Sequence, residues 1–186
     1  MRISTELIAA IVNQLAINPC GLHGLSHWAR VYANGLRLAE TTGADARVVE
    51  LFALFHDSRR LTEQADPEHG PRGAVLAEQL RGVVYQLDEQ PFQLLLAACR
   101  LHTAARTHAD VTVQTCFDAD RLDLGRIGKT VDPQFLCTEA ARNPETLVWS
   151  TEQSTAGIVP DNPIGRALRS LKPLGYCHLA GENGPR

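Results

Sequence analysis

The chain has 186 residues, of which 44% are hydrophobic and 21% charged, and its formal net charge is −3 at pH 7. This length and composition predict one ordinary domain that buries its own core. The small negative charge argues against a nucleic-acid polymer or an anionic membrane as partner, so a small phosphorylated ligand would need a local group of basic side chains.

Helical periodicity is clear in the first third of the chain. Ser4 is a candidate N-cap for a first helix, and the apolar spacing predicts a second helix over residues 25–41 that Gly43 ends. Asp45 is placed to cap a third helix, ARVVELFALFHD, which is apolar on nearly every side. That pattern predicts a buried central helix.

Shorter helices are expected in the middle of the chain. Asp66-Pro67 reads as a capped start of a fourth helix that runs to about Leu80, and Asp88 opens a fifth through residue 102. A sixth helix is expected over residues 112–124, and Asp132-Pro133 predicts a short seventh. The chain therefore reads as an all-α helical bundle over residues 1–143.

The C-terminal part has a different composition. Residues 144–186 are rich in Pro and Gly, with one short helical pattern over 164–171. We expect an irregular extension packed on the same domain, and the sequence leaves a homodimer open.

Five cysteines are present, an odd number, and no pair has CxxC spacing: Cys20, Cys99, Cys116, Cys137 and Cys177. Three of them lie in apolar patterns, where cysteine acts as a small hydrophobic residue. We therefore expect reduced thiols and a cytoplasmic location. No apolar run has the length of a membrane span.

Several ionisable residues lie where burial is expected. His56 and Asp57 end the most apolar helix, His27 lies near the start of the second helix, and Asp120 lies on an apolar face of the sixth. A buried carboxylate is costly unless it is paired or binds a metal. Imidazole and carboxylate together suit a divalent first-row metal, so these four residues are candidate ligands.

Other residues are candidates for the same site. His69 and His102 are placed to reach the cavity and complete a second metal site, although a single buried histidine is more often a hydrogen-bonded core residue. Asp118 has polar neighbours and suits contact with solvent or a supporting role, and Asp123 is open to either role. His23, His108 and His178 lie in loop-like sequence and are expected at the surface.

The order of these residues resembles the H…HD…D signature of the HD superfamily of metal-dependent phosphohydrolases. The segments that carry the resemblance are HGLSHWARV, LFALFHDSRR, DPEHGPRGA, LHT and FDADRLDLGRIG, which together span about residues 20–142. They look like a bacterial group of small, stand-alone HD proteins. The resemblance implies an all-α bundle with metal ligands His27, His56, Asp57 and Asp120, and matches His69 and His102 to second-metal or catalytic positions. LHT in place of a double histidine, without a GYP motif, argues against cyclic dinucleotides as substrate.

The hypothesis is hydrolysis of a small phosphate ester or nucleotide by a metal-activated water. One or two divalent ions (Mn, Fe, Zn, Ni, Co or Mg) would serve as cofactor, Asp57 or Asp118 would orient the water, and His69 or His102 would bind the second ion or protonate the leaving oxygen. The arginines near the site in sequence, which suit phosphate, are Arg59, Arg60, Arg72 and Arg106. Two alternatives stay open: a dinuclear-iron oxygenase that uses six protein ligands, and a regulatory module that binds metal or nucleotide without turnover.

Overall fold

Helices make up the fold in the computed structural model, which describes residues 3–171, 173 and 177. Within these residues no strand forms, and an isolated β-bridge joins Arg81 to Tyr85. The all-α class expected from the sequence is confirmed. Over the same residues, no helix combines the length and the apolar character that a bilayer crossing requires.

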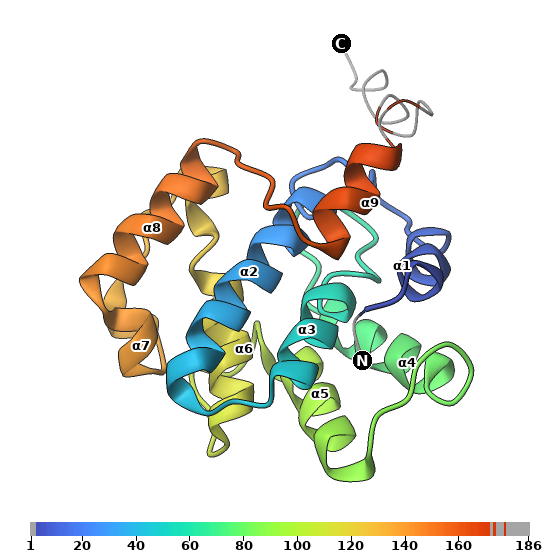
Figure 1. Cartoon of the computed structure of the whole chain (residues 1–186), viewed down its shortest axis with the longest axis horizontal. Helices are drawn as coiled ribbons and strands as arrows, with labels where there is room; N and C mark the ends of the chain where they lie inside the picture. Colours follow the sequence, from blue (N-terminus) through green and yellow to red (C-terminus); the bar gives the residue numbers. More distant parts are fainter. Residues whose placement is uncertain (1–2, 172, 174–176, 178–186) are drawn as a thin grey trace.

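The elements follow one another as a series of short and medium helices (Figure 1). They are α1 (Thr5–Val12), α2 (Leu25–Thr42), α3 (Ala46–Phe55), α4 (His69–Leu80), α5 (Glu89–Leu101), α6 (Val111–Arg121), η1 (Leu124–Ile127), η2 (Pro133–Phe135), α7 (Glu139–Arg142), α8 (Pro144–Thr155) and α9 (Pro163–Leu171).

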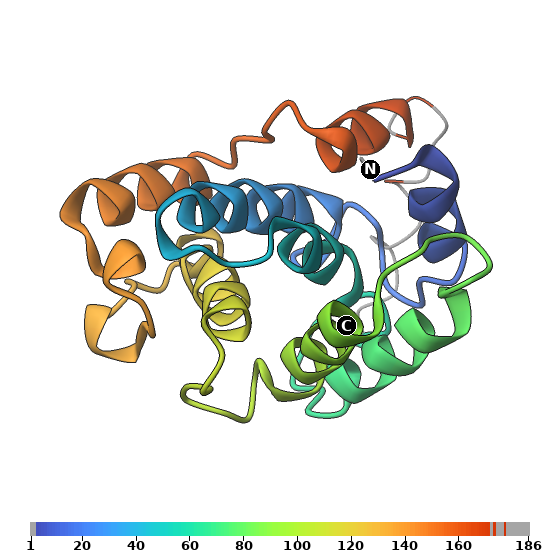
Figure 2. The ribbon, with the colours of Figure 1, turned by 60° about the horizontal axis from the view of Figure 1, so that its bottom comes forward.

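Two helices form the centre of the fold. α2 packs against α3, α6 and α9, and α3 packs against α5, α6 and α4. Figure 2 shows α2 between α8 and α9 on one side and α6 on the other. Every α3 side chain from Val48 to Phe55 is buried except Glu50, so the predicted central helix is confirmed. This burial fixes the C-terminal end of α3, which carries His56 and Asp57, deep inside the bundle.

Local sequence signals place several helix ends correctly. The Ser4 hydroxyl accepts a hydrogen bond from the Leu7 amide, and the Asp45 carboxylate accepts from the Arg47 and Val48 amides. The fourth helix differs from its predicted start, because Asp66 is not its cap. The Asp66 carboxylate accepts from the Leu61 amide and pairs with Arg72, and α4 begins at His69.

The C-terminal extension is mainly helical up to residue 171, so its predicted irregularity is wrong for α8. α8 begins with Pro144 directly after Asn143, whose side chain accepts from the Glu145 amide. Proline is favoured at the first position of a helix, where its missing N–H costs nothing. The short helical pattern over residues 164–171 is confirmed as α9, which packs against α2 and α1. His178 and the rest of the tail lie outside the described residues.

The cysteines are not all reduced. Cys20 and Cys177 form a disulfide, with 5.3 Å between their Cα atoms, and this contradicts the expectation for these two residues. Cys99 and Cys116 are free and buried, as expected of small hydrophobic residues. Cys137 is free and half-buried in the segment before α7.

Candidate metal centre

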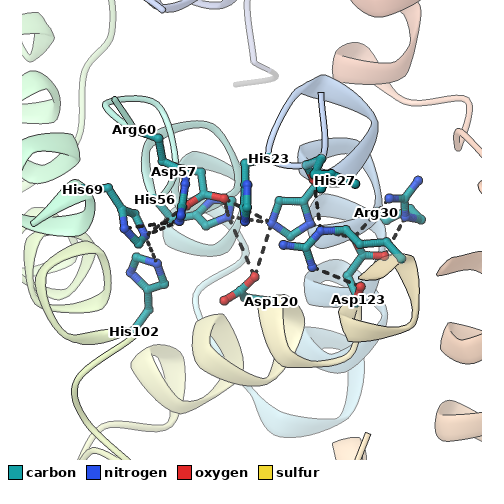
Figure 3. Close-up of polar contacts among 12 residues, drawn as sticks. His23, His27, Arg30, His56, Asp57, Arg60, His69, His102, Asp120 and Asp123 are labelled. Atoms are coloured by element: carbon teal, nitrogen blue, oxygen red, sulfur yellow. Dashed lines mark hydrogen bonds and ion pairs between the residues drawn. The ribbon is translucent and has the colours of Figure 1, made fainter. Parts of the chain in front are cut away.

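The four candidate ligands from the sequence converge between α2, α3 and α6 (Figure 3). The Nε2 atom of His27 lies 3.1 Å from Nε2 of His56, 3.5 Å from Oδ2 of Asp57 and 3.3 Å from Oδ1 of Asp120. Ligand atoms bound at about 2.1 Å from one ion are about 3 Å apart at right angles, so these spacings suit a common cation. We call these four residues the first group.

The orientation of the two rings in the first group favours a cation between them. Nδ1 of His27 lies 2.6 Å from Oδ2 of Asp123, and Nδ1 of His56 lies 3.1 Å from the Phe52 carbonyl. Both partners only accept hydrogen bonds, so in the neutral form of each ring Nδ1 carries the proton and Nε2 keeps a lone pair. Two lone pairs 3.1 Å apart repel unless a proton or a metal ion lies between them.

A second group lies directly beside the first. Nε2 of His69 is 2.9 Å from Nε2 of His102 and 3.0 Å from Oδ1 of Asp57. The Nδ1 of each ring again faces a backbone carbonyl, that of Asp66 for His69 and that of Cys99 for His102. All three side chains are buried. The second group therefore turns two imidazole nitrogens and one carboxylate oxygen toward one point, as a metal site requires.

Asp57 links the two groups. Its Oδ2 faces His27 and His56, and its Oδ1 faces His69. Burial alone would raise the pKa of Asp57, but its interactions with the surrounding histidines, among them the hydrogen bond with His69, hold that pKa well below its usual range. The carboxylate thus turns one oxygen to each group and would offer a ligand atom to a cation held at either one.

Two glycines allow the second group to assemble. A Cβ on Gly70 would lie 2.2 Å from the Cys99 carbonyl and 3.0 Å from the His102 ring, and one on Gly73 would lie 2.2 Å from the Phe55 carbonyl. Real side chains do not fit at such distances, so only glycine lets α4 come this close to α3 and α5. The close approach brings His69 of α4 against His102 and Asp57.

Asp123 supports His27 from behind and lies away from the point where the ligands meet. Its Oδ2 accepts from Nδ1 of His27, and its two oxygens accept from Nε and Nη2 of the buried Arg30 at 2.6 and 3.2 Å. Burial and the charge of Arg126 lower the pKa of His27, but hydrogen bonds to Asp120 and Asp123 raise it overall. Asp123, which the sequence left open to two roles, thus orients a candidate ligand.

His23 lies beside the site rather than at the surface where sequence analysis placed it. Its Nδ1 is 2.7 Å from a Glu63 carboxylate oxygen, its side chain is 14% exposed, and its ring centre is 6.3 Å from that of His27. The signal that points to it is the spacing of four residues in HGLSH, although only the fold shows that the loop bends inward.

The catalytic role expected for Asp118 does not fit the structure. Its carboxylate is buried and accepts hydrogen bonds from the Cys137 amide and from the amide and hydroxyl of Thr138, at 2.7–2.8 Å. Burial raises the pKa of Asp118, against the effect of these hydrogen bonds. Asp118 therefore holds the segment before α7 and points away from both groups.

Of the predicted phosphate-binding arginines, the structure brings only Arg60 to the two groups. Arg59 donates to the Gln14 carbonyl, Arg72 pairs with Asp66, and Arg106 donates to the Gln134 carbonyl and covers the Phe135 ring. These three tie loops together. Arg60 is buried, with Nη1 3.4 Å from Oδ1 of Asp57 and 3.3 Å from Nδ1 of His69.

The buried histidines predict an acid-sensitive metal-free protein. Burial lowers the pKa of His56 to about 3, so this ring stays neutral in the fold while the unfolded chain protonates it below about pH 6.5. Burial also lowers the pKa of His102. His56 should therefore cost roughly 2 kcal/mol of stability between pH 7 and pH 5, and His102 should add to this loss. His27 has the opposite effect, because its raised pKa means that the fold favours the protonated ring and gains stability as the pH falls.

We therefore expect urea unfolding of metal-free protein to shift to lower urea as the pH falls from 7 to 5. The His56→Gln variant should show a flatter dependence, since it lacks one of the two titrating rings. A midpoint that stays constant over this range would contradict the expectation.

Fold and site together define an all-α protein with two adjoining His/Asp groups that could hold metal ions. The chain is similar to the symmetrical bis(5'-nucleosyl)-tetraphosphatase of Bacillus subtilis (strain 168), with 25% identity over 177 residues that cover 84% of this chain and 88% of that protein. No family model matches the chain. No solved structure matches it. A distant relative of this protein is thus a nucleotide phosphohydrolase.

Proposed function

We propose that this protein is a metal-dependent phosphohydrolase of the HD type that cleaves a phosphoanhydride bond of a nucleotide. The observation that carries the proposal is the convergence of six buried or half-buried ligands on two adjoining points, with Asp57 facing both. The H…HD…D order of these ligands in the sequence supports the HD assignment, and the distant relative supports the reaction class.

Divalent ions bound at these groups would supply Lewis acidity toward a phosphoryl oxygen and toward the attacking water. The chain itself holds the ligands in place for this chemistry. Asp123 fixes the His27 ring, the Phe52 carbonyl fixes the His56 ring, and Arg60 balances the charge of Asp57. Asp120, whose side chain is 23% exposed, is the most accessible of the first group, so a substrate would approach bound ions on that side.

The proposed substrate is a nucleoside polyphosphate, and the relative's name gives the particular compound to test first. Symmetrical cleavage of a bis(5'-nucleosyl) tetraphosphate places water at one of the two central phosphates and yields two nucleoside diphosphates. Each divalent ion adds positive charge to a site whose own charged groups balance, so a polyanion suits the loaded site better than a neutral substrate.

The experiment is hydrolysis of bis(5'-adenosyl) tetraphosphate by purified protein loaded in turn with Mn, Fe, Co, Ni, Zn or Mg. We expect ADP as the sole nucleotide product. Formation of ATP and AMP would overturn the symmetrical assignment but keep the hydrolase. Nucleotide binding without any product, across all metals, would overturn the hydrolase and favour the regulatory module.

A second candidate is a dinuclear-iron oxygenase, which the six convergent ligands also favour: His27, His56, Asp57, His69, His102 and Asp120. The two candidates differ in their need for oxygen. Turnover of the tetraphosphate in anaerobic buffer at the aerobic rate would support hydrolysis. Product formation that stops without oxygen would support the oxygenase.

A further inference from the structure

Three arginines whose side chains are less than a tenth exposed lie around the first group, and within the described residues one of them has a terminal nitrogen that makes no hydrogen bond. Arg30 uses all three of its nitrogens, on the Asp123 carboxylate and the Ile158 carbonyl. Arg60 likewise uses all three, on Asp57 and on the carbonyls of Thr62 and Gln64. Each nitrogen of these two guanidinium groups therefore already donates to the protein.

Arg126 differs from both. This residue of η1 donates from Nε to the Leu22 carbonyl and from Nη1 to the Asp123 carbonyl, each at 3.1 Å. Its Nη2 makes no hydrogen bond to any described residue and is not fully enclosed. The side chain is nevertheless only 8% exposed. A guanidinium this buried, held at two nitrogens and free at the third, is preorganised for an anion.

The position of Arg126 connects it to the metal ligands. Its Nε lies 3.7 Å from Oδ2 of Asp123, the same oxygen that accepts from His27. The Leu22 carbonyl that holds it directly precedes His23, whose ring lies beside that of His27. Asp123 therefore lies between Arg126 and the first group, and Arg126 is on the side of the loop that carries His23.

The charges of the site also favour an anion there. Three carboxylates, of Asp57, Asp120 and Asp123, are matched by three guanidinium groups, of Arg30, Arg60 and Arg126. Bound divalent ions would leave the loaded site strongly positive. A single phosphate at the ions would not neutralise this charge, whereas a polyphosphate chain would.

We propose that Arg126 binds a second phosphate of the substrate, next to the phosphate that lies at the metal groups, and so selects a polyphosphate chain over a monophosphate. This inference rests on the proposed function for the identity of the site. Nη2 donates to a phosphate oxygen, and the guanidinium charge strengthens that bond. The residue binds substrate and takes no part in proton transfer.

The test compares Arg126→Gln and Arg126→Lys with wild type, by calorimetric titration of metal-loaded protein with inorganic phosphate and with tripolyphosphate. We expect Arg126→Gln to weaken tripolyphosphate binding by about tenfold or more and phosphate binding by less than about twofold. Arg126→Lys keeps the positive charge, so its affinity for tripolyphosphate should lie between those of wild type and Arg126→Gln. Arg100→Gln, which removes an exposed arginine paired with Glu78, is the matched control and should bind both anions as wild type does.

Metal content is measured after each titration, since tripolyphosphate also chelates metal. Equal tripolyphosphate affinity in wild type and Arg126→Gln would overturn the inference, as would an equal loss for both anions. A metal content that falls in Arg126→Gln and in Arg126→Lys would also overturn it, because Arg126 would then act through Asp123. The titrations measure binding and need no turnover. A negative result here would therefore overturn the role of Arg126 without deciding whether the protein is a hydrolase.

Discussion

The Asp57→Asn variant is expected to lose most of its bound metal and to hydrolyse the tetraphosphate about a thousandfold more slowly or worse. Oδ1 and Oδ2 of Asp57 face different groups, so one substitution removes an anionic oxygen from both. The amide nitrogen of asparagine carries no lone pair for a metal ion. A thousandfold corresponds to about 4 kcal/mol, within the several kcal/mol that a Lewis acid supplies. Metal analysis and initial rates measure the two effects.

Asp118→Asn is the matched control, since it makes the same substitution at a buried aspartate outside the site. Its amide would turn donor hydrogens toward the donors of Cys137 and Thr138, which should cost about 1–3 kcal/mol of stability. Metal content and the rate per folded molecule should match wild type. If Asp118→Asn lost metal as Asp57→Asn does, the loss would reflect a general disturbance of the bundle, and the assignment of Asp57 would fall.

The sequence was sufficient to predict features that depend on neighbouring residues and on several such signals occurring together. The apolar periodicity of residues 46–55 defines a buried helix, and a His-Asp pair directly after such a helix must be satisfied by partners inside the bundle. The preference for Asp120 over Asp118 followed from the apolar neighbours of Asp120 together with the ADR motif in FDADRLDLGRIG that the family resemblance matches. The structure places Asp120 against His27 and turns Asp118 toward Thr138, because neighbouring helix positions differ by about 100°.

The sequence was insufficient where the outcome depends on which chain segments meet. Arg59 and Arg72 lie close to the His-Asp pair in sequence, yet both bind loop carbonyls or Asp66. Arg126 is distant in sequence and lies at the site, because η1 folds back onto the loop before α2. His23 was assigned to the surface for the same reason. Closeness in sequence is therefore a poor guide to which arginines lie at the site when several loops of a helical bundle converge at one end.

The second large effect is expected for His102→Ala, which should reduce bound metal from about two ions per chain to about one. His102 belongs to the second group, and its Nε2 faces His69 and no residue of the first group at hydrogen-bond distance. The first group keeps all four of its ligands in this variant. We expect tetraphosphate hydrolysis to fall by at least about a hundredfold, since both ions would act on the phosphoryl group. Metal per chain is measured on protein purified and reconstituted in the same way.

Two further variants decide how this result is interpreted. His56→Ala removes a ligand of the first group and should also lower metal content, whereas His108→Ala removes a histidine that only supports the Asp110 amide and should leave it unchanged. About one ion in wild type, lost in His56→Ala but kept in His102→Ala, would show that the protein uses a single ion. The buried pair of Nε2 atoms at 2.9 Å in the second group would then have to share a proton.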